Sequence, residues 1–283
     1  MSSRTVFTVI TPREIRMFVL PLLIVVILGS FIQRVERLVY GVRPGVMLDG
    51  QPVGGLFAHE VRRIVERKAQ VYNTPPVNAQ IDKKTREIIP GEMGKMIDID
   101  GTVRMVLEAS PRESLSSVVS EIRPEITFEM LVTLDESLGV FHTTLMGSPG
   151  RMQNIRLCME AINNTVVGPG ETFSFNQVVG ERTYDKGYRP APVIVGSSVI
   201  DDIGGGVCQV SSTLYNAVRV AKLEIVERHL HGMSVTYIAR GMDATVAWPD
   251  VDFKFRNNTT LPVIVSAVVA GGQVRVEIVG KKR

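Results

Sequence analysis

Apolar residues recur at intervals of three and four along several segments of this chain, a spacing that predicts amphipathic helices. Four such segments follow the first forty residues: 58–72, 100–110, 151–166, and one that begins close to Cys208. Elsewhere apolar and polar residues alternate over short runs, such as 234–238, which predicts strands, and residues 125–134 are expected to form a strand or linker. The clearest run forms a β-rich C-terminal part, in which residues 261–270 and 273–279 flank a Gly271-Gly272 turn. The pattern as a whole predicts an α+β fold.

The order of the predicted elements divides the chain into three parts. Residues 1–42 hold a cytoplasmic stub, an apolar helix and a polar, basic linker. Residues 43–127 form a small α+β module in which no catalytic constellation is visible. Residues 128–283 form a larger α+β domain of a catalytic type, with the β-rich part at its C-terminal end.

The first part predicts export. Residues 17–32 carry no charge, and Arg4, Arg13 and Arg16 precede them. Because basic residues favour the cytoplasmic side, the run predicts a single membrane-anchoring helix with the N-terminus inside and the later domains on the outer, cell-wall side. A cleaved signal peptide is the alternative, but the residues after the run make a poor cleavage site, so we favour an uncleaved anchor.

The composition of the chain argues against several classes of function. Apolar residues make up 45% and charged residues 22% of the chain, and the net charge is only +3, so nothing indicates a nucleic-acid partner. The two cysteines, Cys158 and Cys208, are too few for a disulfide framework or a cysteine zinc site. We expect neither a metal nor a cofactor.

The most informative stretch is Gly204-Gly-Gly-Val-Cys208, which leads into a helical pattern. Consecutive glycines suit a tight turn at which backbone approaches backbone or ligand closely. At the start of the following helix, unpaired N–H groups and the helix dipole favour a thiolate. A nucleotide-binding loop would end in Gly-Lys-Ser/Thr, which this stretch lacks. The pattern therefore predicts a turn and helix start that position Cys208 as a nucleophile.

A nucleophilic thiol needs a base and a group that orients the base. His231 is the candidate base, His229 is its competitor two positions away, and Asp243 is the candidate orienting group. The N–H groups of Cys208 and Gln209 are candidate oxyanion donors. Candidate substrate-binding residues come from the loop before the turn, from the turn and from the helix after it: Arg182, Tyr184, Tyr188, Gly205, Gly206, Gln209, Ser211 and Ser212.

Structural roles for the cysteines are the alternative. Cys158 lies in the middle of a predicted helix among apolar neighbours, which favours a buried, inert thiol. A disulfide between Cys158 and Cys208 would fit an oxidising compartment, but a core-facing partner argues against it.

At these motifs the chain resembles the VanW family over residues 140–265. The residues that carry the resemblance are Asn154-Ile155-Arg156, Gly168-Pro-Gly-Glu-Thr-Phe-Ser-Phe-Asn176, Val179-Gly-Glu-Arg182, Gly187-Tyr188, Gly204-Gly-Gly-Val-Cys-Gln-Val-Ser-Ser-Thr-Leu-Tyr-Asn216, Glu227-Arg228, His231, Gly241-Met-Asp-Ala-Thr-Val246 and Asn257-Asn258. Through Pro44-Gly-Val, Gly54-Gly-Leu and the Ile88-Ile-Pro90…Gly94…Ile97-Asp98 pattern, residues 43–127 resemble the peptidoglycan-binding type of module that often precedes this domain.

The resemblance implies L,D-transpeptidation of peptidoglycan, to which some family members have been linked, with Cys208 as nucleophile and His231 as base. The implied partners are peptidoglycan stem peptides. Gly232 follows the histidine where the family pattern leads us to expect serine, which removes a polar helper beside the base. Two alternatives stay open: a non-catalytic wall-binding or scaffold protein, in which Arg182, Tyr184 and Tyr188 recognise the peptide, and a cysteine hydrolase of stem peptides.

Overall fold

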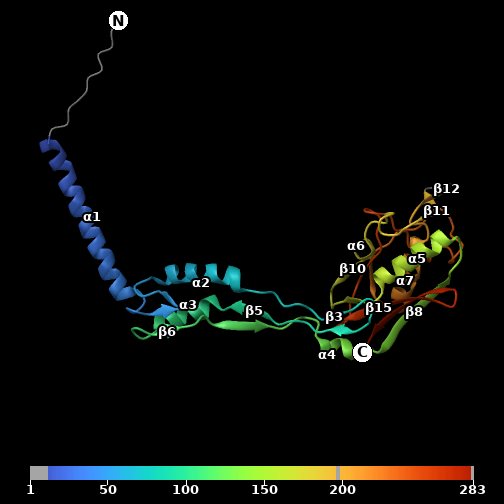
Figure 1. Ribbon diagram of the computed structural model, residues 1–283, viewed down its shortest axis with the longest axis horizontal. Helices are drawn as coiled ribbons and strands as arrows, with labels where there is room; N and C mark the ends of the chain where they lie inside the picture. Colours follow the sequence, from blue (N-terminus) through green and yellow to red (C-terminus); the bar gives the residue numbers. More distant parts are fainter. Residues whose placement is uncertain (1–11, 196–197, 282–283) are drawn as a thin grey trace, which may run out of the picture. The chain divides into compact units, whose positions relative to one another are not determined.

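The computed structural model describes residues 12–195 and 198–281, and within them the chain folds into seven helices and sixteen strands (Figure 1). The α+β class predicted from the sequence is confirmed. Contacts divide the described chain into two compact units. The first comprises the described part of Met1–Pro75 with Met93–Ile122, and the second comprises Pro76–Glu92 with the described part of Arg123–Arg283. Residues 76–92, which the sequence pattern assigned to the small module, therefore pack within the second unit.

The first unit contains three helices, of which α2 and α3 pack against each other, and short strands. Its elements are α1 (Pro12–Tyr40), β1 (Met47–Leu48), β2 (Gln51–Pro52), α2 (Ala58–Tyr72), β5 (Gly94–Ile97), α3 (Ile99–Glu108), β6 (Ser114–Leu115) and β7 (Val119–Ile122). The strands form a β2-β1-β6 sheet and a β5-β7 pair. The helical spacing predicted over residues 58–72 buries Val61, Val65 and Ala69 in the core of this unit.

Arg37, near the C-terminal end of α1, contacts the following part of the first unit. Arg37 forms an ion pair with Glu60 at 2.8 Å, donates to Gly55 O at 3.0 Å, and lies 5.0 Å from the centre of the Phe57 ring. Residues 1–11 of the predicted cytoplasmic stub lie outside the described residues. Among the helices that the structure describes, none has both the length and the apolar composition that a membrane span requires.

The second unit is built on the antiparallel sheet β8-β16-β15-β9. Its helices are α4 (Phe128–Val132), α5 (Pro149–Ile162), α6 (Phe175–Val179) and α7 (Val207–Val220). Its strands are β3 (Gln80–Ile81), β4 (Ile88–Ile89), β8 (Glu136–Thr144), β9 (Thr165–Val167), β10 (Thr172–Ser174), β11 (Pro190–Val195), β12 (Ser198–Ile203), β13 (Glu224–Glu227), β14 (Lys254–Arg256), β15 (Val263–Ala270) and β16 (Gln273–Gly280). The predicted Gly271-Gly272 hairpin joins β15 to β16.

Helices α5 and α7 pack on the four-stranded sheet, α5 against β15 and α7 against β8 and β16. Figure 1 shows both helices beside this sheet. A Cβ atom at Gly139 of β8 would lie 2.4 Å from the carbonyl oxygen of Ala217, so only glycine fits between strand and helix. Beside it, the hydroxyls of Thr143 and Thr213 share a buried hydrogen bond of 2.9 Å. These contacts fix the position of α7, whose first turn carries Cys208.

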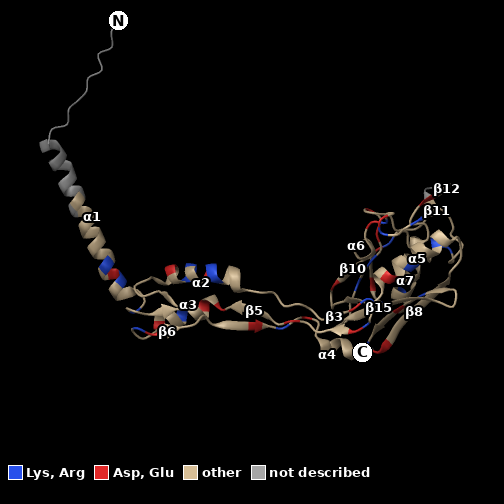
Figure 2. Ribbon diagram, in the orientation of Figure 1, with Lys and Arg blue, Asp and Glu red and all other residues tan. Residues whose placement is uncertain are grey.

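The second unit also contains the three-stranded sheet β10-β14-β13, which contributes Phe173 and Phe255 to the core. Phe173 and Phe255 stack at 4.9 Å between ring centres, and Tyr215 of α7 meets Phe253 edge to face at 5.7 Å. Charged residues of both signs are interspersed along the described chain, in keeping with the small net charge (Figure 2).

Three local predictions differ from the structure. The helix predicted over residues 151–166 ends at Ile162, because Asn164 has a φ of 54° and Thr165 begins strand β9. Residues 125–134, predicted as a strand or linker, contain helix α4 with Thr127 as its N-cap. Residues 234–238 alternate in polarity but form no strand: residues 236–238 are bends, and the segment pairs with no neighbouring strand among the described residues.

Candidate active site

Cys208 lies in the first turn of α7, directly after a turn of three glycines. Gly206 is the N-cap residue and has a φ of 105°, a left-handed conformation that glycine adopts without steric cost. The N–H of Val207 donates to Gly204 O at 3.1 Å and closes the turn. The thiol of Cys208 is partly exposed and donates to the carbonyl of Val246 at 3.4 Å. The helix-start position expected for this thiol is therefore observed.

Gly205 serves packing in this turn. A Cβ at this position would lie 2.5 Å from the carbonyl oxygen of Ala191 in β11. Its own carbonyl accepts a hydrogen bond from the buried side chain of Asn154 at 2.9 Å, and the same amide pairs with the backbone of Arg189 in both directions. We expected Gly205 to bind substrate, but the structure places it behind the pocket wall, where it allows close backbone contact.

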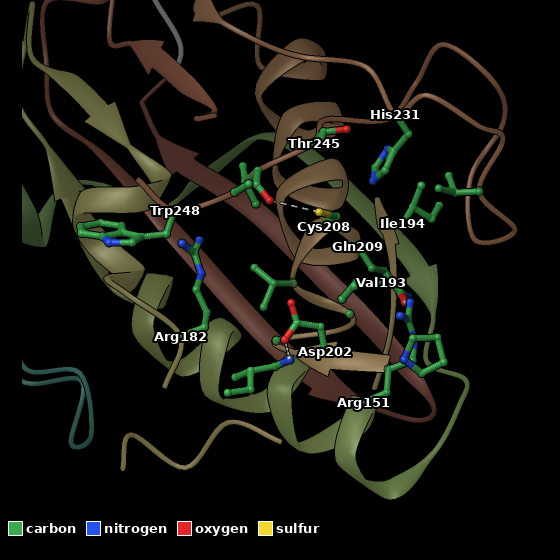
Figure 3. A pocket seen from close by; sticks show the side chains of 18 of the residues that line it. Arg151, Arg182, Val193, Ile194, Asp202, Cys208, Gln209, His231, Thr245 and Trp248 are labelled. Atoms are coloured by element: carbon green, nitrogen blue, oxygen red, sulfur yellow. Dashed lines mark hydrogen bonds between the residues drawn. The ribbon is translucent and has the colours of Figure 1, made fainter. Parts of the chain in front are cut away.

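His231 and Asp243 form a buried pair beside Cys208. Asp243 Oδ2 accepts hydrogen bonds from both the backbone N–H and the ring Nδ1 of His231, each at 2.7 Å. Only 5% of the His231 side chain and 8% of the Asp243 side chain is exposed. In Figure 3 the imidazole of His231 lies above Cys208 and points towards it. A carboxylate that holds Nδ1–H leaves Nε2 as the ring nitrogen able to accept a proton.

The surroundings shift both pKa values of this pair. Burial disfavours the imidazolium, but the neighbouring Cys208 and the hydrogen bond with Asp243 together outweigh burial, so the pKa of His231 is raised above its usual value of 6.5. For Asp243, burial likewise favours the neutral form, but hydrogen bonds from the backbone and the ring of His231 prevail and lower the pKa of the carboxyl below 3.8. The arrangement thus favours an ionised Asp243 beside a histidine that can hold a proton.

The structure also decides between the two candidate bases. His229 is 46% exposed at its side chain, and its Nε2 pairs with Glu227 at 3.0 Å. It is outside the pocket that Cys208 lines, whereas His231 is part of its wall. Of the two histidines, His231 is therefore the one that lines the same pocket as Cys208.

The segment that carries Asp243 is fastened to α7 by hydrogen bonds. Ser211 donates to Ala244 O at 2.6 Å, Ser212 accepts from Ala244 N at 2.9 Å, and Asn216 donates to Met242 O at 2.7 Å. Both serines are fully buried, and Ser212 also donates to Cys208 O at 2.7 Å. We had expected Ser211 and Ser212 to bind substrate. Instead, both are buried and hold the segment that carries Asp243 against the helix that carries Cys208.

Arg228 completes this attachment from the other side. Its Nε donates to Asp243 O at 2.8 Å and its Nη2 donates to Gly241 O at 2.6 Å. The guanidinium lies 4.2 Å from the centre of the Tyr215 ring on α7. Cation–π contact and two charge-assisted hydrogen bonds thus join Asp243 to the same helix that carries Cys208.

Cys208 and His231 open onto a pocket of about 400 Å³. Its walls come from the ends of α5 and α7, the β11–β12 hairpin and the segment from His231 to Trp248 (Figure 3). The lining residues are Arg151, Glu181, Arg182, Pro192, Val193, Ile194, Asp202, Ile203, Gly204, Gly206, Val207, Cys208, Gln209, His231, Val235, Tyr237, Thr245, Val246, Ala247 and Trp248. An open pocket of this size with a few polar groups beside a thiol can hold part of a peptide.

The remaining predicted binding residues divide between the pocket and other places. Arg182, Gly206 and Gln209 line the pocket. Gln209 is 1% exposed, because its side-chain amide donates to Thr143 and to Thr144 O while its oxygen accepts from Arg151 at 2.8 Å. Tyr188 is 4% exposed and belongs to the core, and Tyr184 is 57% exposed. Neither tyrosine is among the residues that line this pocket.

The expected oxyanion donors are only partly available. The Gln209 N–H donates to Gly206 O at 3.0 Å, since the chain turns tightly at the start of α7, so this group is not a free donor. The Cys208 N–H takes part in none of the turn or cap hydrogen bonds of the described residues. The backbone N–H of Cys208 is therefore the remaining candidate oxyanion donor.

Sequence inspection missed several residues of the pocket. Arg151, Tyr237 and Trp248 all line it. Arg151 follows Ser148, which is the N-cap of α5, and Pro149-Gly150, which begin the helix. This helix-start pattern was the local signal that Arg151 lies at the end of a helix. Tyr237 lay in the stretch expected to be a strand, and Trp248, the single tryptophan of the chain, had no partner motif.

Comparison with known proteins places this geometry in a family. The family model described as VanW like protein matches residues 150–279, which include Cys208, His231 and Asp243. Over 217 residues, 75% of this chain and 71% of the relative, the sequence is 39% identical to the uncharacterized protein YoaR of Bacillus subtilis. The chain belongs to the VanW family.

A second VanW relative is more distant. The vancomycin B-type resistance protein VanW of Enterococcus faecalis is 30% identical over 111 residues, which cover 38% of this chain and 40% of that protein. No solved structure matches this VanW chain. The family resemblance inferred from the motif around Cys208 is confirmed.

Proposed function

We propose that this protein is a cell-envelope acyltransferase that cross-links peptidoglycan stem peptides through Cys208, by L,D-transpeptidation. The observation that carries the proposal is the Asp243–His231 pair, whose imidazole points at a helix-start thiol inside a peptide-sized pocket. A merely structural cysteine has no need of a base held by a buried carboxylate. The name of the Enterococcus faecalis relative, a vancomycin resistance protein, supports a role at the cell wall.

The first half of the reaction forms a thioester. His231 Nε2 accepts the thiol proton, and Cys208 Sγ attacks the carbonyl carbon that joins the third and fourth residues of a donor stem peptide. Asp243 stabilises the imidazolium, and the Cys208 N–H donates to the oxyanion. The C–N bond then breaks, His231 returns its proton to the leaving amine, and D-alanine departs.

The second half transfers the acyl group. A side-chain amine of an acceptor stem peptide attacks the thioester carbon and forms a new C–N bond. His231 accepts a proton from that amine, the C–S bond breaks, and the thiolate is restored for the next cycle. With water in place of the amine, the same residues would hydrolyse the peptide.

The substrate requires the second unit to lie outside the cytoplasm. We propose that the apolar run of residues 17–32 holds the protein at the membrane with the domains on the cell-wall side. Fractionation of cells together with protease accessibility of the second unit would test this arrangement.

The central experiment uses the full chain with purified disaccharide-tetrapeptide and mass spectrometry of the products. Cross-linked dimers and released D-alanine that disappear in Cys208→Ala would support the proposal. Released D-alanine without dimers would favour the hydrolase. Tight binding without any product, unchanged by Cys208→Ala, would contradict an enzyme and favour the wall-binding protein.

A further inference from the structure

Two arginines reach the pocket from opposite sides of Cys208 (Figure 3). Arg151 comes from the first turn of α5, and Arg182 comes from the loop that follows α6. Neither takes part in a salt bridge within the described residues. Both side chains are half-buried, so each keeps a positive charge in partial isolation from water without a carboxylate beside it.

The protein holds Arg182 in a fixed orientation and leaves part of it unused. Its Nη2 donates to Asn176 Oδ1 at 2.9 Å, and its guanidinium lies 5.7 Å from the centre of the Phe175 ring. Its Nη1 is buried and has no hydrogen-bond partner among the described residues. An unpaired buried donor on a cation is costly, which points to a partner that arrives with the ligand.

Arg151 is held in the same manner. Its Nη2 donates to Gln209 Oε1 at 2.8 Å, its Nε donates to Met146 O at 3.2 Å, and the guanidinium lies 5.9 Å from the centre of the Tyr237 ring. Burial lowers the pKa of Arg151, against the opposing influence of Tyr237 and Cys208. All three of these partners are neutral, so none of them balances the positive charge of Arg151.

Glu181 and Asp202 also line the pocket but do not neutralise the two arginines. Both residues are exposed, and Asp202 Oδ1 accepts from the backbone N–H of Ile203 at 2.7 Å. Water screens charges at exposed positions far more than at buried ones. The deeper part of the pocket therefore favours an anion, while its rim does not.

We infer that the pocket between Arg151 and Arg182 is the subsite for the C-terminal carboxylate of the residue that Cys208 expels: Arg182, whose Nη1 is unpaired, pairs with the carboxylate, and Arg151 adds positive charge from the opposite wall. The inference rests on the proposed function, since it names which end of the peptide the pocket holds. Guanidinium groups match carboxylates with paired, charge-assisted hydrogen bonds. Such a subsite selects a donor with a free carboxylate one residue beyond the attacked carbonyl. A peptide that is amidated there, or extended by another residue, lacks this anion and binds less well.

Binding to a full-length Cys208→Ala protein tests the subsite without requiring catalysis. Calorimetry would compare a synthetic tetrapeptide stem in the free-acid and carboxamide forms. We expect the free acid to bind about tenfold more tightly, and either Arg151→Gln or Arg182→Gln to remove most of that preference. Arg156→Gln is the matched control, because Arg156 lies on the same helix as Arg151 but is exposed and outside the pocket. Thermal unfolding of each variant excludes loss of fold, and Arg151→Lys tests whether charge alone suffices.

Equal affinity for the two peptide forms would overturn the subsite, even if the wild-type protein acylates both. A preference that survives in both glutamine variants would overturn it as well. If the free acid is preferred through the arginines but the wild-type protein forms no thioester, the subsite stands and the proposed transpeptidation fails.

Discussion

One carboxylate oxygen, Asp243 Oδ2, accepts both the backbone N–H and the ring Nδ1–H of His231. The two hydrogen bonds fix the rotation of the ring and its tautomer together, since the ring cannot turn without losing its bond to an oxygen that the backbone N–H also holds. Nε2 is then the ring nitrogen presented to Cys208. The orientation of the imidazole thus depends on one residue twelve positions away along the chain.

Asp243→Asn should slow thioester formation by at least about a hundredfold, because the imidazolium loses its stabilising charge and the tautomer is no longer fixed. The pKa of His231 should fall at the same time, which NMR of the ring protons measures. Asp250→Asn is the control, since Asp250 is exposed and outside the pocket. An unchanged rate with a lowered pKa would contradict the assigned role of His231.

Stability should depend on pH through the same pair. The pKa of His231 is raised, so its contribution is complete below about pH 6.5 and is lost as the pH rises through the folded-state value. The pKa of Asp243 is lowered, so its contribution is present above about pH 3.8 and is lost as the pH falls through the folded-state value. The difference in unfolding temperature between wild type and Asp243→Asn should therefore be largest between these limits. A difference in unfolding temperature that does not vary with pH would contradict a stabilising interaction between ionised Asp243 and protonated His231.

Arg228→Ala should lower both stability and the acylation rate. The change removes two hydrogen bonds to the Gly241–Asp243 backbone and the contact with Tyr215, at a cost of about 1–3 kcal/mol. Arg219→Ala is the matched control. Arg219 also lies 5.6 Å from the centre of the Tyr215 ring, but it makes no hydrogen bond to residues 241–243 among the described residues. Denaturant unfolding and pre-steady-state acylation measure the two effects. A similar loss of rate in Arg219→Ala would show that the ring contact, rather than the segment, is responsible.

Alkylation should distinguish the two thiols, both of which are free. Burial raises the pKa of Cys158 to about 12, so this thiol stays protonated and inaccessible at neutral pH. We expect iodoacetamide to add one group to the folded protein, to add none to Cys208→Ala, and to react more slowly with His231→Ala. Intact mass spectrometry measures the additions. Two groups on the folded wild type would contradict the buried position of Cys158.

Gly205→Ala should disturb the turn that carries Cys208. The new Cβ would meet backbone atoms of Ala191, which cannot rotate away, so we expect a loss of about 3 kcal/mol and slower alkylation of the thiol. Gly170→Ala is the comparison: its φ of 73° costs about 1 kcal/mol, but no other atom lies within 4 Å of the added Cβ. Chemical unfolding and the alkylation rate test the contrast. Equal losses in the two variants would show that space behind Gly205 is not limiting.

The sequence by itself determined the local features of this protein. Helical spacing placed α2 at its observed bounds, Gly271-Gly272 marked the β15–β16 hairpin, and three glycines before Cys208 marked the start of α7. These features depend on residues that are close together in the sequence, so their periodicity and backbone preferences can be recognised without the tertiary structure. The family membership also followed from such local motifs.

Only the tertiary structure decided which residues share the site. His229 and His231 look equivalent in sequence, but their different burial follows from packing against Asp243. Ser211 and Ser212 look like binding residues, yet they face the segment that carries the acid. Arg151 meets Gln209 across 58 positions of chain. A sequence period tells which face of an element is buried, but what lies opposite that face depends on contacts between distant segments.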